Sequence, residues 1–221
     1  MRVVVLLSTR HDAVLGLALR LGEVIALRAG PREEEPLLRD ALALGAKRAV
    51  RLWHPVLGET DYLGLATALA AAATHLEGQL LLAGDHGGGA VGPAVAERLG
   101  WPHLCGVIGA ALEEDTEGGG ARLVVERRTS WGRQRLRGPA EAVLCVAAGP
   151  AAGDKRGDMA GASIEVLDLQ DVGLDRLDLG HRRHLLPQAG AAPVLRPTPR
   201  CFPSADALLA RLHKDGVLPR G

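Results

Sequence analysis

The fold is decided by the stretch from Gln79 to Pro102, which reads QLLLAGDHGGGAVGPAVAERLGWP. Its first residues form an apolar run, which is typical of a strand buried on both faces of a sheet. The glycine-rich loop from Gly84 to Pro93 follows, and we expect a helix that ends by Gly100. A strand, a glycine loop and a helix in this order predict a parallel α/β sheet.

The residues before this stretch show the same alternation of strands and helices. The acids at residues 33–35, Pro36 in the first turn and a closing Gly45 are typical helix signals. An alternating pattern favours a doubly wound sheet with right-handed crossovers. We expect strands at Val3–Leu7, Val24–Arg28, Ala49–Leu52 and Gln79–Ala83, and helices at Ala13–Leu21, 36–45 and Tyr62–Leu76.

The pattern changes after Trp101, where strands follow one another without helices. Residues 180–203 contain five prolines and no periodicity, which predicts an extended arm, and Ser204 is expected to cap a last helix through His213. We therefore expect an α/β domain over residues 1–178 and an arm with a terminal helix over residues 179–221. The added strands, expected to join the sheet as antiparallel members, are His103–Leu112, Ala121–Arg128, Gln134–Arg137 and Ala142–Ala147, with a short strand at Ser163–Leu167.

The composition limits the possible functions. The 221 residues carry 26 basic and 26 acidic side chains, so binding of nucleic acid through a basic field is not indicated. The three cysteines form no CxxC pair, which fits a reducing compartment and a cytoplasmic protein. The apolar run at Met1–Leu7 is too short for a signal peptide or a membrane span, so no membrane insertion is expected.

The glycine loop and the helix after it are the main candidate binding site. Ligands of doubly wound sheets bind beyond the carboxyl ends of the strands, and a helix start offers free N–H groups to a phosphate. Pro93 has no N–H to donate, but Gly92, Ala94 and Val95 have one. A tight connection that needs glycine for its turns explains the same residues equally well.

Other polar groups give weaker signals. Ser8, Thr9 and Arg10 follow the first strand at the same edge, either as ligand contacts or as a plain βα turn with Asp12 as a helix cap. Asp85 and His86 adjoin the glycine loop, but neighbouring side chains on a loop diverge as often as they converge, so we assign no catalytic residue.

Two basic stretches fit solvated surfaces better than sites. His181 and His184 lack a second pair at metal-ligand spacing, so we assign no metal site. A basic hairpin surrounds Trp131, and the alternation of its arginines favours one exposed face, with docking of a partner as the second interpretation. Its arginines are Arg127, Arg128, Arg133, Arg135 and Arg137.

Several motifs together resemble the β subunit of electron transfer flavoproteins. The opening strand, RVVV at residues 2–5, the element ALALGAKR at residues 41–48, and the whole stretch from Gln79 to Pro102 are similar to the family's elements. The hairpin residues Val125-Glu-Arg127, Gly132 and Leu136-Arg137 match its VER…G…LR pattern, and residues from 191 to the last helix resemble its C-terminal arm.

The resemblance implies an adenine nucleotide α-hydrolase-like fold and a heterodimer with an α subunit. It implies an electron carrier subunit, not a catalyst with its own substrate, passing electrons from flavin-dependent dehydrogenases to a downstream acceptor. FAD is then held mainly by the α subunit, and AMP is bound by this chain. The residues we assign to the nucleotide are Ser8, Thr9, Gly87, Gly88, Gly89, Val91 and Gly92.

The chain departs from the family pattern at the nucleotide loop. Gly89-Ala-Val-Gly92 stands where the family has a longer loop with an NQTG element, so backbone groups would do most of the binding. Two other functions fit the same core: a stand-alone nucleotide-binding module like universal stress proteins, and a scaffold subunit without a ligand.

Overall fold

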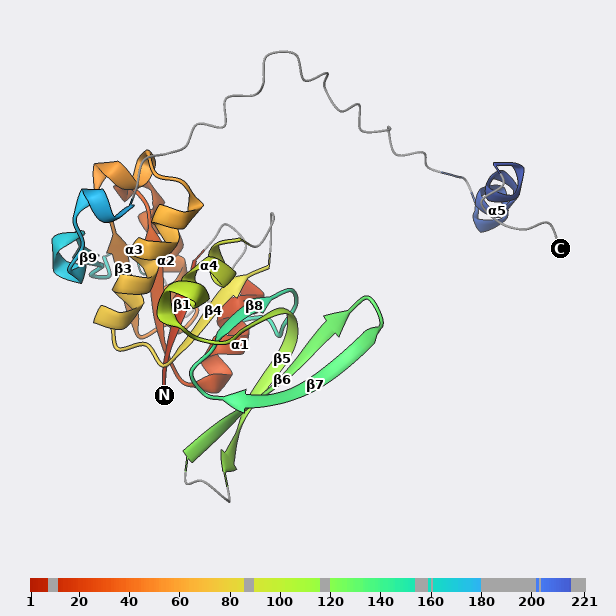
Figure 1. Ribbon diagram of the computed structural model, residues 1–221, viewed down its shortest axis with the longest axis horizontal. Helices are drawn as coiled ribbons and strands as arrows, with labels where there is room; N and C mark the ends of the chain where they lie inside the picture. The colour runs from red at the N-terminus through yellow and green to blue at the C-terminus, as the bar shows by residue number, and fades with distance from the viewer. Residues whose placement is uncertain are drawn as a thin grey trace, which may run out of the picture. The chain divides into compact units, whose positions relative to one another are not determined.

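The computed structural model describes residues 1–7, 12–85, 90–115, 120–153, 159, 161–179, 202 and 204–215. The chain divides into two units, Met1–Arg183 and His184–Gly221. The first unit contains the sheet with helices α1 to α4, and the described part of the second contains helix α5 (Figure 1).

One sheet of nine strands organises the first unit, in the order β7-β6-β5-β8-β4-β1-β2-β3-β9. The predicted α/β class with a mainly parallel sheet is confirmed, because each pairing from β5 through β8 to β9 is parallel. The strands are β1 (Arg2–Leu6), β2 (Glu23–Ala29), β3 (Arg48–Leu52), β4 (Leu80–Gly84), β5 (His103–Asp115), β6 (Gly120–Thr129), β7 (Gly132–Pro139), β8 (Val143–Val146) and β9 (Glu165–Leu167).

Of the four strands that were expected to join the sheet as antiparallel members, β8 does not, so the expectation is wrong for this strand. β8 lies between β4 and β5 and runs parallel to both, with Leu144 opposite Leu82 and Leu104. Its four residues are buried, because a central position covers both faces of the strand. Only β5, β6 and β7 form the antiparallel part.

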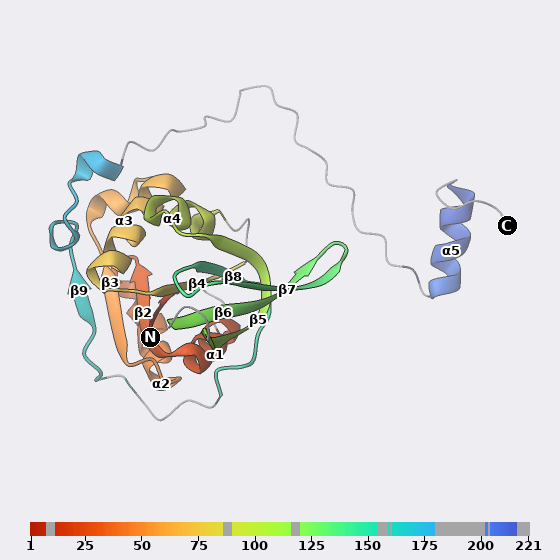
Figure 2. The same ribbon diagram turned by 60° about the horizontal axis from the view of Figure 1, so that its bottom comes forward.

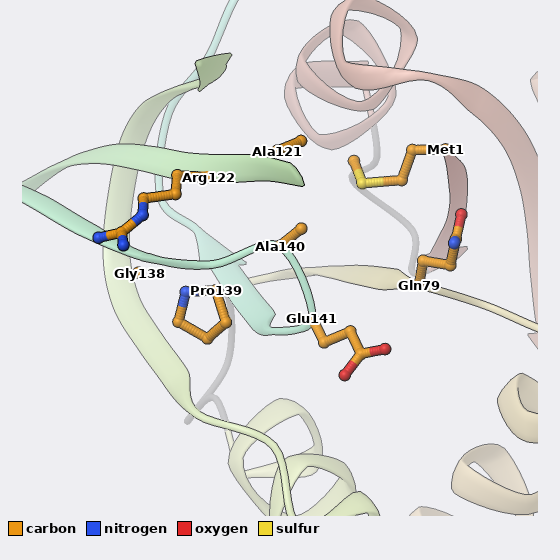
Figure 3. A pocket seen from close by; sticks show the side chains of 8 residues that line it. All are labelled: Met1, Gln79, Ala121, Arg122, Gly138, Pro139, Ala140 and Glu141. Atoms are coloured by element: carbon orange, nitrogen blue, oxygen red, sulfur yellow. The ribbon is translucent and has the colours of Figure 1, made fainter. Parts of the chain in front are cut away.

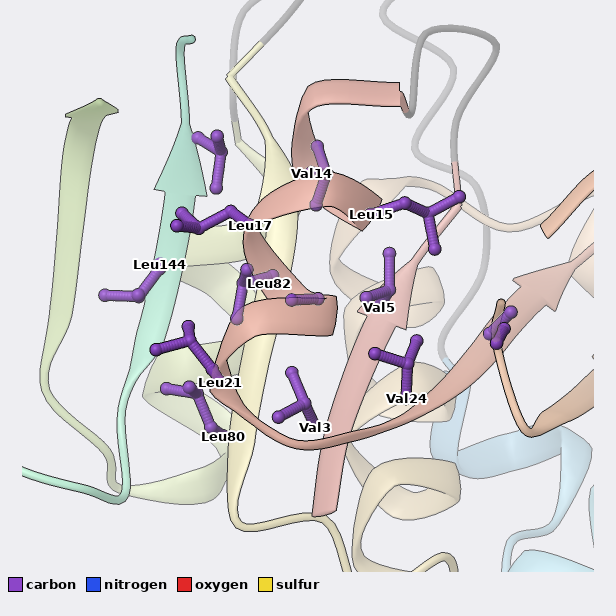
Figure 4. Close-up of a cluster of buried hydrophobic side chains, with 14 of the residues drawn as sticks. Val3, Val5, Val14, Leu15, Leu17, Leu21, Val24, Leu80, Leu82 and Leu144 are labelled. Carbon is purple, nitrogen blue, oxygen red and sulfur yellow. The ribbon is translucent and has the colours of Figure 1, made fainter. Parts of the chain in front are cut away.

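The helices cover the two faces of the sheet as separate layers (Figure 2). α1 and α2 cover one face, where Leu15, Leu17 and Leu21 pack on strand residues such as Val3 and Leu82 (Figure 4). α3 and α4 cover the other face with small side chains, mostly alanines of α3. The helices are α1 (Asp12–Leu21), α2 (Glu35–Ala43), α3 (Tyr62–His75), α4 (Val91–Leu99) and α5 (Ala205–Lys214), with 3-10 turns η1 (Arg32–Glu34), η2 (Pro55–Gly58), η3 (Gln170–Val172) and η4 (Arg176–Leu179).

The ends of several helices follow from the predicted signals. Gly100 adopts the left-handed conformation that closes α4, with φ 67°. Asp61 caps α3 by accepting hydrogen bonds from the amides of Leu63 and Gly64. Ser204 caps α5 as expected, because its hydroxyl accepts from the amide of Ala207.

β5 changes direction at a bulge between Leu104 and Val107. Gly106 lies in the bulge with φ 74°, and a Cβ there would approach the carbonyl oxygen of Arg128 to 2.6 Å. Only glycine fits this position without strain. The bulge lets β5 leave the parallel sheet and continue as a twisted ribbon with β6 and β7 (Figure 1).

Candidate functional site at the carboxyl edge of the sheet

The strand order reverses between β1 and β4. The chain runs outward from β1 through β2 to β3 on one side. On the other side it passes from β4 to β5, and β8, which follows β7 in the chain, lies between them. β1 and β4 are direct neighbours, with Leu6 opposite Ala83, so the carboxyl ends of the two strands lie side by side. A switch point of this kind is where doubly wound sheets bind ligands.

Both predicted binding segments leave the sheet at this switch point. Ser8 and Thr9 follow β1, and Gly87, Gly88 and Gly89 follow β4, but these five residues lie outside the described part of the chain. Val91 and Gly92 are described, and they form the first turn of α4. The structure thus places the start of the predicted helix at the expected edge.

The first turn of α4 has two N–H groups, those of Val91 and Gly92, for which the described residues supply no acceptor. Ala90 precedes the helix and its side chain makes no capping hydrogen bond. The amide of Ala94 donates to the carbonyl of Ala90 at 3.1 Å, so the expectation that Ala94 offers its N–H to a ligand is wrong. Pro93 has no N–H, which leaves Val91 and Gly92 as the first-turn donors.

Gly92 is required for packing between α4 and the sheet. A Cβ at this residue would lie 2.7 Å from Sγ of Cys145 and 3.5 Å from Cβ of Ala83. The absence of a side chain therefore lets α4 approach β4 and β8 closely. This explanation is independent of any ligand, and it was not foreseen from the sequence.

Asp85 has a structural partner. Its carboxylate accepts a hydrogen bond of 3.1 Å from the amide of Gly106, and its own amide donates to the carbonyl of Val146 at 2.9 Å. The residue therefore ties the end of β4 to the bulge of β5. His86, the residue after it in the sequence, lies outside the described residues.

Arg28 holds the end of β1 from the neighbouring strand. One of its terminal nitrogens donates to the carbonyl of Leu7 at 2.8 Å, and its Nε donates to the carboxylate of Glu34 at 2.6 Å. Leu7 is the last described residue before the segment that contains Ser8 and Thr9. In the sequence, Arg28 is an arginine near the end of an apolar strand, and this pattern alone did not predict its bonds to Leu7 and Glu34.

Two cysteines lie on neighbouring strands below the same edge. Cys145 in β8 is buried, and Cys105 in β5 is half-buried. Burial raises the pKa of the Cys145 thiol well above its usual range, and the neighbouring Cys105 raises it further. A thiol held neutral in this way is a poor nucleophile.

A wide groove of about 740 Å³ lies at the opposite, amino edge of the sheet (Figure 3). The helices around the sheet direct their amino ends to the other edge, where doubly wound sheets bind ligands. The groove therefore lies at the edge away from the predicted site. The groove is lined by Met1, Gln79, Ala121, Arg122, Gly138, Pro139, Ala140 and Glu141.

Neither a metal centre nor a membrane helix is found in the part of the chain that the structure covers. No cluster of three or more His, Cys, Asp or Glu side chains is placed to hold a metal ion among these residues. His181 and His184 lie outside them. None of the described helices is long and apolar enough to span a bilayer.

The hairpin of β6 and β7 presents its arginines on an exposed face, as expected. Arg133, Arg135 and Arg137 are all exposed. Arg135 and Arg137 both pair with Glu113 in β5, at 2.9 Å and 3.1 Å, across the intervening strand β6. Most of this face is thus a solvated surface with internal ion pairs.

Comparisons with known proteins agree with this architecture. The family described as "Electron transfer flavoprotein domain" matches residues 11–172. A protein of Mycobacterium bovis named electron transfer flavoprotein subunit beta is 32% identical over 189 residues, which is 81% of this chain and 66% of that protein. The protein of Methylophilus methylotrophus with the same name is 29% identical over 193 residues, which is 80% of this chain and 72% of that protein.

A third relative has a different name. Protein FixA of Rhizobium meliloti is 35% identical over 149 residues, or 58% of this chain and 48% of that protein. The chain thus spans slightly less than two thirds of the mycobacterial relative and about half of FixA.

Proposed function

Because this chain belongs to the electron transfer flavoprotein family, we propose that it is the β subunit of a heterodimeric electron carrier. In this proposal an α subunit is its permanent partner, and the pair passes electrons from flavin-dependent dehydrogenases to a downstream acceptor in the cytoplasm. The named relatives support the subunit type, because they are electron transfer flavoprotein β subunits.

The observation that carries the proposal is the switch point between β1 and β4. A segment with hydroxyl side chains follows β1 and a segment rich in glycine follows β4. Ala90, which precedes α4, gives the first-turn amides of Val91 and Gly92 no side-chain cap. A helix start with free amides favours a phosphate group. We infer that AMP binds there, held by Ser8, Thr9, the loop residues Gly87, Gly88 and Gly89, and the amides of Val91 and Gly92.

In this proposal, the flavin is bound mainly by the partner subunit. A bound flavin supplies one-electron chemistry, and this chain contributes the carboxyl edge of its sheet as the surface beside it. Among the described residues of that edge, the thiol of Cys145 is buried and the carboxylate of Asp85 accepts a hydrogen bond from Gly106. A carrier role without a substrate of its own fits these residues.

We further propose that residues 179–221 pack on the partner subunit. Helix α5 exposes Leu208 and Leu209, with 40% and 46% of their surfaces accessible. A helix of ten residues is marginal without packing of its apolar face. A partner subunit that covers these leucines would stabilise α5.

The proposal is tested by co-expression with an α-type subunit, followed by acid extraction of the purified complex. We expect a stable one-to-one complex with bound flavin and AMP in the extract, identified by mass spectrometry. A stable complex without any adenine nucleotide would favour a scaffold subunit. A monomer that binds ATP tightly and no partner would favour a stand-alone module.

A matched pair of variants tests the position of the nucleotide. In Val91→Asp, a carboxylate at the start of α4 should repel the phosphate and lower AMP affinity by at least about tenfold. The helix itself should not be weakened, because an acid near a helix start is favourable. Val91→Asn loses the same packing without the charge and should retain AMP. Equal AMP affinity in both variants would place the phosphate elsewhere.

A further inference from the structure

The turn between β6 and β7 carries a side chain that the fold does not use. Trp131 is 95% exposed. The turn is held by Thr129, whose hydroxyl donates to the carbonyl of Gly132 and accepts from the amide of Trp131. The indole takes no part in these bonds. A fully exposed tryptophan is unfavourable for a free chain and is common in binding surfaces.

Two arginines beside Trp131 face each other without a carboxylate. Arg128 and Arg133 lie directly opposite in the register of β6 and β7. Like charges in such positions repel. In the described residues of both units, no acid pairs with either side chain. We call Arg128, Trp131 and Arg133 the hairpin tip.

The other arginines of the strand pair differ from the tip. Arg127 donates to Gln134 at 2.9 Å, and Arg135 and Arg137 both bond to Glu113. Among the described residues, Arg128 and Arg133 are thus the arginines of β6 and β7 that have no side-chain partner. Carboxylates from another molecule would offset the repulsion between Arg128 and Arg133.

The hairpin tip is connected to the candidate site through the bulge of β5. Gly106 lies against the carbonyl of Arg128, and its amide donates to Asp85 at the end of β4. Figure 1 shows the turn of β6 and β7 projecting away from the helical layers. A protein seated on the tip would therefore also reach the carboxyl edge of the sheet.

We propose that the hairpin tip docks an acidic surface of the flavin-carrying partner subunit. This inference rests on the proposed function and names the surface that the partner contacts. Trp131 enters an apolar pocket of the partner, and Arg128 and Arg133 bind carboxylates at the rim of that pocket. Tryptophan and arginine are the residue types that most often dominate binding energy at protein interfaces. A nucleic acid is a poorer fit, because the chain has no net charge and the tip offers a single aromatic ring.

The experiment measures binding of the full-length chain to the α-type subunit by surface plasmon resonance at low and high salt. Trp131→Ala should weaken binding by at least about tenfold. The double variant Arg128→Gln/Arg133→Gln should slow association at low salt and reduce the dependence of the association rate on salt. Tyr62→Ala removes an exposed aromatic ring on α3 and Arg20→Gln removes an exposed charge on α1, and both should bind as the unchanged chain does.

A second measurement follows the indole directly. The difference in acrylamide quenching between the unchanged chain and Trp131→Phe reports Trp131, and this difference should fall when the partner binds. The inference is overturned if the unchanged chain binds and the tip variants bind equally well, in which case the proposed function still stands. Absence of any complex with the unchanged chain overturns both. Trp131-dependent binding to anionic vesicles or single-stranded DNA, with subunit binding unaffected, overturns the choice of a protein partner.

Discussion

At the residue scale, Gly92 is subject to two opposing effects. Alanine is favoured over glycine within helices by about 1 kcal/mol. A Cβ at residue 92 would, however, lie 2.7 Å from Sγ of the buried Cys145. The close approach of α4 to β8 therefore decides which residue is tolerated.

We predict that Gly92→Ala lowers the free energy of unfolding by about 1–3 kcal/mol, because overpacking exceeds the gain in helix propensity. Cys145→Ala removes the sulfur that the new methyl group would meet. The double variant should then be more stable than the sum of the two single changes predicts. Urea denaturation of the four proteins measures this coupling, and strict additivity would show that the two side chains do not meet.

Cys145 also gives a chemical prediction, because burial raises the pKa of its thiol. At pH 8 iodoacetamide should label Cys105 and leave Cys145 unmodified, since only the thiolate reacts. In urea both cysteines should react at similar rates. The raised pKa also implies that stability falls as the pH rises above about 8.5, because the unfolded thiol then loses its proton while the folded one retains it. Peptide mass spectrometry measures the labelling, and rapid modification of Cys145 in the folded chain would contradict its burial.

At the scale of elements, the bulge of β5 joins the parallel and antiparallel parts of the sheet. Asp85 holds Gly106 in this bulge by a single side-chain hydrogen bond. The bulge sets the direction in which β5, β6 and β7 leave the parallel sheet. The position of the hairpin tip therefore depends on a residue at the end of β4.

We predict that Asp85→Ala costs about 1–3 kcal/mol, because the amide of Gly106 loses its acceptor. Asp85→Asn keeps an oxygen that accepts a hydrogen bond and should cost less. Hydrogen exchange at Gly106 and in β6 should accelerate in Asp85→Ala while α2 is unchanged. If α2 exchanged faster to the same extent, the bond would act on the stability of the whole unit and not on the bulge.

At the scale of the whole molecule, the hydrophobic core of the described residues lies entirely in the first unit. Both core clusters end at or before Leu179. Helix α5 in the second unit exposes Leu208 and Leu209. The stability of the first unit should thus be independent of the second.

We predict that deletion of residues 184–221 shifts the melting temperature of the chain by less than about 2 °C, because none of the core residues in the described part of the chain is removed. The same deletion should weaken binding to the α-type subunit if the arm packs on the partner. Calorimetry and size-exclusion chromatography measure the two effects separately. A large fall in melting temperature would show that the second unit contributes to the stability of the first.

Local signals in the sequence were sufficient to predict most of the helices and strands. Apolar runs such as Val3–Leu7 marked the central strands, and Pro36, Gly100 and Ser204 marked the ends of helices, because each of these signals acts within a few residues. The position of α4 after β4 was also predicted from the sequence, and the strand order shows that β4 lies beside β1 at the switch point of the sheet.

Only the tertiary structure decided how distant segments pair. The short strand Val143–Val146 lies between β4 and β5 and is parallel to both. A run of four apolar residues predicts a strand, but its sequence does not indicate which strands it pairs with or in which direction, because pairing depends on contacts with distant residues. For the same reason, the contact of Gly92 with Cys145 and the bond from Arg28 to Leu7 were not foreseen. The sequence by itself determined which elements form and that this chain is an α/β protein of its family. Long-range packing decided which side chains of those elements meet.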